Sequence, residues 1–205
     1  GPGMELSPIE GHVGTSLTIS GSGFVASKRV TITYDGNELG SATTDTTGSF
    51  SDVSFPSPKS MHGEHEVKAT DASGNSVTAT FVMESEAPVK PALNLPANES
   101  RVGFIGKATP TFEWSNVTDP SGVSYNLQIA TSENFTEVVI SKTQLSQASY
   151  TLASEEALSH GSYYWKVKAV DGAQNESERT TAYPFKPCLL PLWAFIAIIV
   201  LVVAL

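Results

Sequence analysis

Residues 161–171, GSYYWKVKAVD, decide the fold class of this chain. Apolar and polar side chains alternate in its centre, with Trp165 and Val167 on one face and Lys166 and Lys168 on the other. A period of two is typical of a strand with one buried face, because successive strand side chains point to opposite sides of a sheet. We therefore expect a half-buried β-strand whose aromatic rings supply much of the buried area.

Similar short runs occupy most of the chain before this segment. VSYNLQIA (123–130) alternates in the same way, and TPTFEWSNV (109–117) places two aromatic residues on one face. Asp35-Gly36 is a hairpin signal, because both central residues of a type I′ turn need a positive φ. Many short strands joined by Gly, Asn and Asp turns predict an all-β fold of two tandem β-sandwiches.

Proline marks the boundary between the two predicted sandwiches. The segment ESEAPVKPALNLP (84–96) contains three prolines, which exclude helix and favour an extended linker. We predict a first sandwich at 5–84, a linker at 85–91 and a second sandwich at 92–186. The opening GPGM (1–4) resembles the remnant of an expression tag and is left out of the fold prediction.

The first half resembles prokaryotic immunoglobulin-like repeats of the IPT/TIG kind. The resemblance rests on SPIEGHVGTSLTISGSGF (7–24), VTITYDG (30–36), TTDTTGSFS (43–51) and ATDASGNS (69–76), and it covers most of residues 7–83. It implies an immunoglobulin-like β-sandwich for this half of the chain.

The second half resembles a fibronectin type III domain of the prokaryotic kind. The residues that carry the resemblance are Trp114, Tyr125, Leu158, Gly161 and Tyr163. In that family a leucine and a tyrosine so placed form the tyrosine corner, in which the tyrosine hydroxyl bonds to the backbone. The resemblance assigns these parts to Leu158 and Tyr163, although the spacing is one residue shorter than the commonest family form.

Charge and cysteine content narrow the class of protein further. The chain has 21 acidic and 12 basic residues, a net charge of −9, and SKR (27–29) is its densest basic stretch. Nucleic-acid binding rests on clustered Lys and Arg, so we expect no nucleic-acid partner. Cys188 is the single cysteine, so no intrachain disulfide can form. In an extracellular module this indicates either a prokaryotic cell surface or domains large enough to be stable through packing alone, and we favour the first.

The last 18 residues, CLLPLWAFIAIIVLVVAL (188–205), carry no charge. They predict a C-terminal transmembrane α-helix that is incomplete at residue 205, with Trp193 and Phe195 in contact with membrane lipid. The predicted protein is then a single-pass cell-membrane protein with extracytoplasmic domains. A lipid-anchor tail removed on processing is the alternative for the run, and acylation is an alternative role for Cys188.

Candidate ligands for metal ions are few. MHGEH (61–65) brings His62, Glu64 and His65 together, but the spacing matches no established zinc motif, and we expect a solvated loop. DTTGS (45–49) and DASGN (71–75) resemble pieces of calcium loops without the full set of oxygen ligands, and we expect turns there. We therefore predict no metal and no cofactor.

Motifs of catalysis are absent from the sequence. There is no Gly-x-Ser-x-Gly elbow, phosphate-binding loop or Cys/His couple, so we expect no enzymatic activity. Four Asn-x-Ser/Thr sequons are candidate glycosylation sites, at Asn98, Asn116, Asn134 and Asn175.

These features predict a non-enzymatic, membrane-anchored cell-surface protein with a monomeric ectodomain. Its sandwiches would act as a stalk that displays upstream domains or mediates surface contacts. One alternative is an adhesin or receptor ectodomain that binds a protein or glycan, for which Tyr164 and Tyr183 are a candidate exposed aromatic pair. A further alternative is a set of accessory modules of a surface hydrolase.

Overall fold

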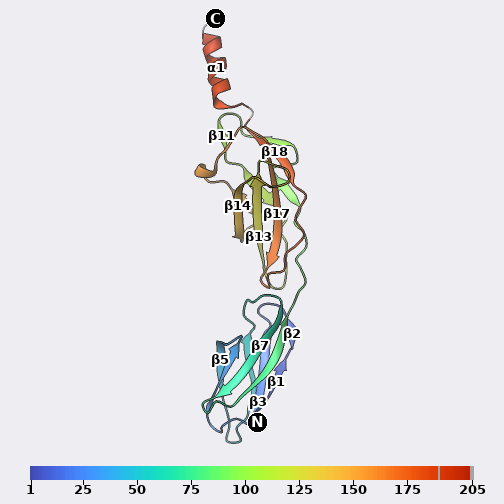
Figure 1. The fold of residues 1–205 in the computed structure, drawn as a ribbon, viewed down its shortest axis with the longest axis vertical. Coiled ribbons are helices and arrows are strands. Elements are labelled where there is room, and N and C mark those ends of the chain that lie inside the picture. Colours follow the sequence, from blue (N-terminus) through green and yellow to red (C-terminus); the bar gives the residue numbers. More distant parts are fainter. Residues whose placement is uncertain (189, 204–205) are drawn as a thin grey trace. The chain divides into compact units, whose positions relative to one another are not determined.

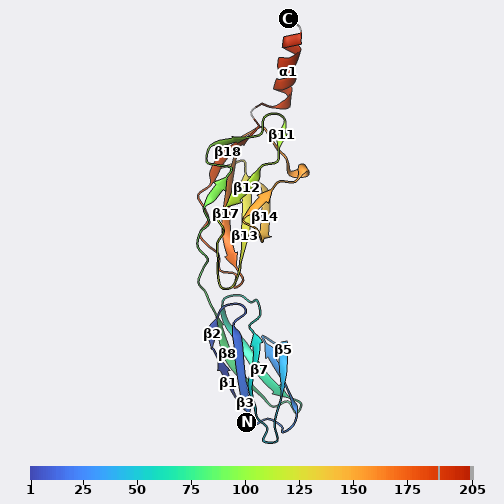
Figure 2. The ribbon, with the colours of Figure 1, turned by 180° about the vertical axis from the view of Figure 1, so that it is seen from behind.

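The computed structural model describes residues 1–188 and 190–203 and confirms the all-β prediction. The chain divides into two compact units, each built around a β-sandwich (Figures 1 and 2). The first unit comprises Gly1–Glu86 with the short segments 120–122 and 172–175. The second unit comprises the remaining residues from Ala87 onward.

The first unit pairs a three-stranded sheet, β1-β3-β6, with a five-stranded sheet, β2-β8-β7-β4-β5. Neighbouring strands are antiparallel except for β2 and β8, which are parallel. The strands are β1 (Gly3–Ser7), β2 (Glu10–Gly11), β3 (Ser16–Ser22), β4 (Arg29–Tyr34), β5 (Asn37–Thr43), β6 (Phe50–Pro56), β7 (Gly63–Asp71) and β8 (Ser76–Met83).

Two local predictions for this unit have clear outcomes. The β4–β5 hairpin turns at Asp35 and Gly36, whose φ values of 49° and 79° are those that a type I′ turn needs, so the hairpin is confirmed. Residues 3 and 4, left out as a tag remnant, belong to β1 instead. Gly3 pairs with Ser22 and Met4 with Gly21, because the backbone of β3 offers an unpaired edge there.

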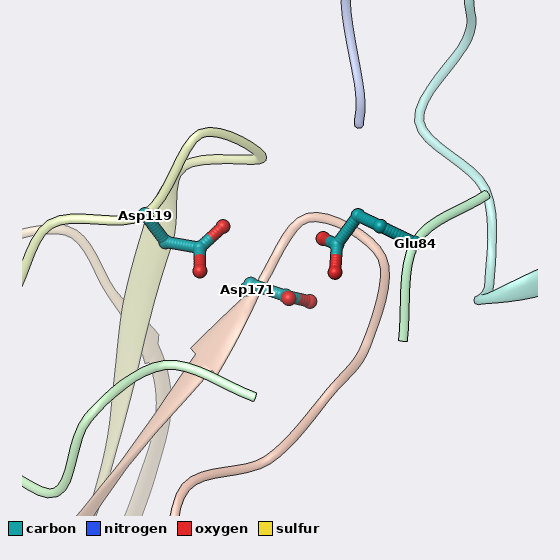
Figure 3. Close-up of side chains that lie close together, drawn as sticks. All are labelled: Glu84, Asp119 and Asp171. Atoms are coloured by element: carbon teal, nitrogen blue, oxygen red, sulfur yellow. The ribbon is translucent and has the colours of Figure 1, made fainter. Parts of the chain in front are cut away.

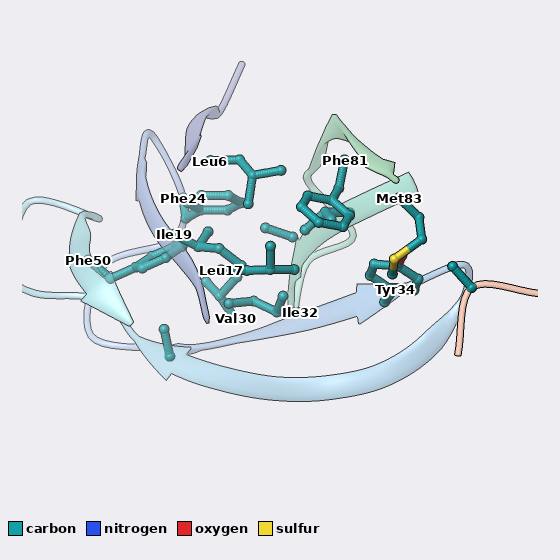
Figure 4. Close-up of a cluster of buried hydrophobic side chains, with 14 residues drawn as sticks. Leu6, Leu17, Ile19, Phe24, Val30, Ile32, Tyr34, Phe50, Phe81 and Met83 are labelled. Atoms are coloured by element: carbon teal, nitrogen blue, oxygen red, sulfur yellow. The ribbon is translucent and has the colours of Figure 1, made fainter. Parts of the chain in front are cut away.

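The core of the first unit consists of many side chains of medium size (Figure 4). Leu17 and Ile19 from β3 face Val30 and Ile32 from β4, and all four have no exposed surface. Phe81 of β8 is buried in the same cluster. Alternating positions of facing strands supply this core, as expected for a sandwich.

The second unit contains a five-stranded sheet, β10-β18-β17-β13-β14, and a three-stranded sheet, β15-β12-β9, with the short pair β11-β16. A 3-10 turn lies at Ser154–Glu156. The strands are β9 (Leu93–Leu95), β10 (Ser100–Val102), β11 (Lys107–Ala108), β12 (Thr111–Trp114), β13 (Val123–Ala130), β14 (Val138–Leu145), β15 (Ser149–Thr151), β16 (Leu158–Ser159), β17 (Tyr163–Asp171) and β18 (Tyr183–Pro187).

Strand β17 has the alternation that its sequence predicts. Trp165, Val167 and Ala169 are buried, whereas the residues between them are only partly buried. The Trp165 ring meets Phe112 edge-on at 5.2 Å between centroids, and its indole N–H donates to the Pro96 carbonyl at 3.2 Å. The core of the second unit is thus organised around one central indole.

The C-terminal apolar run forms a single helix, α1 (Leu192–Val203), of 12 residues. At a rise of 1.5 Å per residue this is about 18 Å long, whereas a bilayer core is about 30 Å thick. In the part of the chain that the structure describes, no helix has the length and apolar character to cross a membrane. The prediction of a single-pass membrane protein is therefore wrong. Trp193 is exposed and Phe195 half-buried on this short helix.

Candidate functional site

The candidate site is the outer face of the five-stranded sheet of the second unit, called here the outer sheet face. It begins with a polar row across three strands, in which Lys166 of β17 pairs with Gln128 of β13, and Gln128 pairs with Ser141 of β14. These residues lie on the side of the sheet opposite the core because their neighbours Val167 and Leu127 are fully buried. Arg179 donates to the Gln128 side-chain oxygen at 2.8 Å.

Two cations therefore lie close together on this row. The ammonium of Lys166 sits 3.5 Å from the centroid of the Phe135 ring. Burial lowers the pKa of Lys166, and the nearby positive charge of Arg179 lowers it further. The residues from this row line a hollow of about 200 Å³.

A second pair of cations lies on the same face. Arg101 of β10 and Lys186 of β18 are directly paired across the two parallel strands. Tyr164 of β17 pairs with Pro184, the residue two before Lys186. Glu99, Arg101, Tyr164 and Lys186 all line a hollow of about 440 Å³. Tyr164 and Lys166 are successive outward residues of β17, so the two hollows adjoin along that strand.

The charge balance of this face is unusual for an acidic chain. Lys168 is neutralised by an ion pair with Glu176. Within residues 1–188 and 190–203, Arg101, Lys166, Arg179 and Lys186 form no ion pair. The alternation of β17 predicts an outward Lys166, but the meeting of Arg101 and Lys186 depends on strand pairing between distant segments, which no local pattern shows.

In the MHGEH segment (61–65), His65 makes hydrogen-bonding and ring contacts with other residues of the first unit. His65 lies at 2.6 Å from the Asp35 carboxylate through Nδ1 and at 2.6 Å from the Met61 carbonyl through Nε2. Its ring stacks on Tyr34 at 5.0 Å. Both ring nitrogens of His65 lie within hydrogen-bonding distance of oxygen atoms of the protein. These contacts join His65 of β7 to the turn at Asp35 and to the segment at Met61. His62 and Glu64 are exposed and, in the described chain, join no group of metal-ligand atoms.

The two calcium-like segments are turns closed by their own aspartates. Asp45 Oδ1 accepts from the backbone N–H groups of Ser49 and Thr47, which lower the pKa of Asp45. The side-chain amide of Asn75 donates to Asp71, and this bond lowers the pKa of Asp71 most, with further bonds from backbone N–H groups. Both carboxylates are occupied by donors of the protein, as expected for turn aspartates.

Three other carboxylates are drawn in Figure 3. Glu84 belongs to the first unit, whereas Asp119 and Asp171 belong to the second. Asp171 is 5% exposed, and both aspartates already take part in polar interactions. Because the three residues come from different units, we assign no site to them.

The four sequons have different environments. Asn98, Asn116 and Asn134 are exposed, whereas Asn175 is only 6% exposed. Asn134 caps its own turn by accepting from Thr136. An attached glycan needs an accessible amide. The structure therefore favours the first three as candidate glycosylation sites and disfavours Asn175.

The predicted structural residues Trp114, Tyr125, Leu158 and Trp165 are all buried in the second core. Tyr163 packs against that core, with its ring 5.9 Å from Phe185. The hydroxyl that bonds to the backbone belongs to Tyr125, which accepts from the Val117 N–H at 2.8 Å and donates to Asn116 at 3.1 Å. Among the described residues, Tyr163 makes no such hydrogen bond.

Two further sequence hypotheses depend on which way a side chain points. Tyr183 pairs with Trp165 and packs against the core, whereas Tyr164 lies on the outer sheet face. They therefore do not form an exposed aromatic pair. Cys188 has no exposed surface, and burial raises the pKa of its thiol. It is a small buried core residue in this structure, which disfavours acylation.

A comparison with protein families supports an immunoglobulin-like fold for the second half of the chain. Residues 97–190 match the family model of the Rha78A-like, N-terminal immunoglobulin domain. The fibronectin(III)-like modules of Clostridium thermocellum CbhA are similar at 17% identity and TM-score 0.38, with 93% of this chain and 96% of that chain covered. The FN1–FN3 domains of chicken CNTN1 are similar at 13% identity and TM-score 0.37, with 90% of this chain and 66% of that chain covered. No curated protein matches the chain.

The chain thus contains an Ig/FN3-like β-sandwich domain, as the sequence predicts. The matching family is described as an immunoglobulin domain, whereas the sequence of residues 97–190 resembles fibronectin type III. The two names describe the same sandwich architecture. The resemblance of the first unit to IPT/TIG repeats stays a prediction.

Proposed function

We propose that the two β-sandwiches act as a non-enzymatic spacer module that positions attached domains. The observation that carries this proposal is that each unit fills its own hydrophobic core. One cluster surrounds Phe81 and the other surrounds Trp165, with both side chains fully buried. A sandwich packed with side chains holds its shape, and each of these units is large enough to fold around one core.

Two further points support a spacer. The polar residues that most resemble functional groups, His65, Asp45 and Asp71, are hydrogen-bonded within the first unit and so contribute to its stability. The family that matches residues 97–190 is described as an N-terminal immunoglobulin domain. That description fits a module that accompanies other domains, although fold alone does not specify function.

Single-molecule extension of the full chain, held at its two ends, tests the proposal. A spacer should resist force and unfold in two separate events. Each event should release roughly 80–95 residues, or about 30 nm at about 3.5 Å per residue. Trp165→Ala should lower the force of one event and leave the other unchanged. Gradual extension without distinct events would refute a load-bearing spacer.

A second candidate function is recognition of a protein or glycan. The observation that favours it is the outer sheet face, where four cations lack ion pairs in the described chain. Recognition does not exclude a spacer role, because a sheet face can bind a ligand while the core beneath it keeps its structure.

A further inference from the structure

We propose that the outer sheet face of the second unit binds an acidic polysaccharide through Arg101, Lys186, Lys166 and Arg179. The proposal goes beyond the spacer function and can fail while that function stands. It rests on three properties of the face: paired like charges, a row of amide and hydroxyl side chains, and an aromatic ring between the two pairs of cations.

The like-charge pairs cost stability, and none of the four cations forms an ion pair in the described chain. Arg101 and Lys186 are direct register partners, and like charges in that position destabilise a sheet. Lys166 and Arg179 flank Gln128, and the positive charge of Arg179 disfavours that of Lys166. Four of the twelve basic residues of a chain with net charge −9 are thus placed on one sheet face. Anionic groups of a ligand would relieve both repulsions.

The hollow beside Lys166 is lined by groups that can form hydrogen bonds with sugar hydroxyls. Asn126, Gln128, Ser141 and Thr143 line it, and all offer amide or hydroxyl groups. A phosphate-only ligand would not need such a row, whereas a sugar ring presents donors and acceptors on every carbon. The row therefore favours a carbohydrate polymer over other polyanions.

Tyr164 connects the two pairs of cations. It lies two residues before Lys166 on the same face of β17, and its partner Pro184 lies two residues before Lys186. Aromatic side chains with one polar end are frequent at recognition surfaces. A saccharide chain that crosses Tyr164 would place carboxylates at both pairs of cations. Glu99 lines the same hollow as Arg101 and Lys186, and its negative charge repels an anionic ligand. The ligand carboxylate should therefore lie on the Arg101 side of this hollow.

The test is a calorimetric titration of the full chain with a β-1,4-mannuronate hexamer, with β-1,4-mannohexaose as the neutral ligand of matched backbone. We expect the acidic hexamer to bind and the neutral one not to bind. The double variant Lys166→Gln/Arg179→Gln should weaken binding about fivefold to tenfold, and Arg101→Gln/Lys186→Gln should do the same. Tyr164→Leu should weaken binding with no change in charge.

The matched control is Lys28→Gln/Lys59→Gln, which removes two exposed cations from the first unit. It should leave affinity within about twofold, since only long-range charge changes. Equal weakening by this control would overturn the assignment to the outer sheet face. Equal binding of mannohexaose would overturn the requirement for acidic groups. Tighter binding of single-stranded DNA than of mannuronate at the same salt concentration would overturn the carbohydrate assignment. An unchanged urea transition confirms that each variant is folded, by tryptophan emission for the variants of the second unit and by far-UV circular dichroism for the control.

Discussion

The two units have the same pairing of a three-stranded with a five-stranded sheet, but they fill the space between the sheets differently. The first core distributes its burial over aliphatic side chains such as Leu17, Ile19 and Ile32. The second concentrates it in large rings, with Trp114 and Tyr125 meeting edge-on at 5.5 Å beside the central Trp165. Because burial scales with apolar area, one substitution should cost the second unit more than the first.

The largest expected effect is Trp165→Ala. The substitution removes the central ring of the second core and should lower the free energy of unfolding of that unit by about 4–5 kcal/mol. All three tryptophans belong to the second unit, so emission from Trp114 still reports its unfolding in urea. Trp193→Ala is the control, because that side chain is 73% exposed and its loss should have little effect. A small effect of Trp165→Ala would contradict the concentrated core.

Phe81→Ala should come next, with a cost of about 3–4 kcal/mol to the first unit. Phe81 is fully buried, but smaller neighbours can close part of the cavity. Far-UV circular dichroism should show an earlier transition, whereas the tryptophan emission of the second unit should keep its midpoint. A shift of both signals by the same amount would show that the two cores unfold together.

Local patterns predicted the strands of both units because alternation reports directly which face is buried. The hairpin at Asp35-Gly36 was equally predictable, since its backbone angles follow from residue type. The roles of Tyr125 and His65 were not predictable, because their partners come from loops that only tertiary packing brings near. The apolar character of α1 was predictable from composition, whereas composition alone does not fix where the regular helix begins.

Gly48 and Gly74 allow a matched test within the turns of the first unit. They occupy the same place in two Asp-x-x-Gly turns and have similar φ values, 80° and 86°. A Cβ on Gly48 would lie 2.2 Å from the Phe24 carbonyl oxygen, whereas a Cβ on Gly74 meets nothing within 4 Å. Gly48→Ala should cost about 2–3 kcal/mol and Gly74→Ala about 1 kcal/mol. Equal urea midpoints for the two variants would show that the turn near Phe24 relaxes.

Tyr125→Phe should cost the second unit about 1–2 kcal/mol, because it leaves the buried Val117 N–H without an acceptor. Tyr163→Phe should change the free energy of unfolding by less than about 0.5 kcal/mol. Tryptophan emission during urea unfolding measures both. A larger effect of Tyr163→Phe than of Tyr125→Phe would indicate that the hydroxyl of Tyr163 forms the hydrogen bond to the backbone.

The smallest expected effects are on how the stability of each unit falls at low pH. The two units differ here because the carboxylate of each has a different kind of partner. The pKa values of Asp71 and Glu156 are both lowered, Asp71 chiefly by the Asn75 amide and Glu156 chiefly by Lys142, whose ammonium lies at 2.5 Å. A carboxylate with a depressed folded-state pKa stabilises above its unfolded-state pKa of about 4, and this stabilisation is lost as the pH falls below that value.

Asp71→Asn should therefore flatten the acid dependence of the first unit, and Glu156→Gln that of the second. One molar NaCl should reduce the second effect and spare the first, because salt screens a partly exposed ion pair more than hydrogen bonds within a turn. Circular dichroism and tryptophan emission, recorded from pH 6 to pH 2, measure the two units in one sample. Equal salt sensitivity would contradict the distinction between a carboxylate held by turn donors and one held by an ion pair.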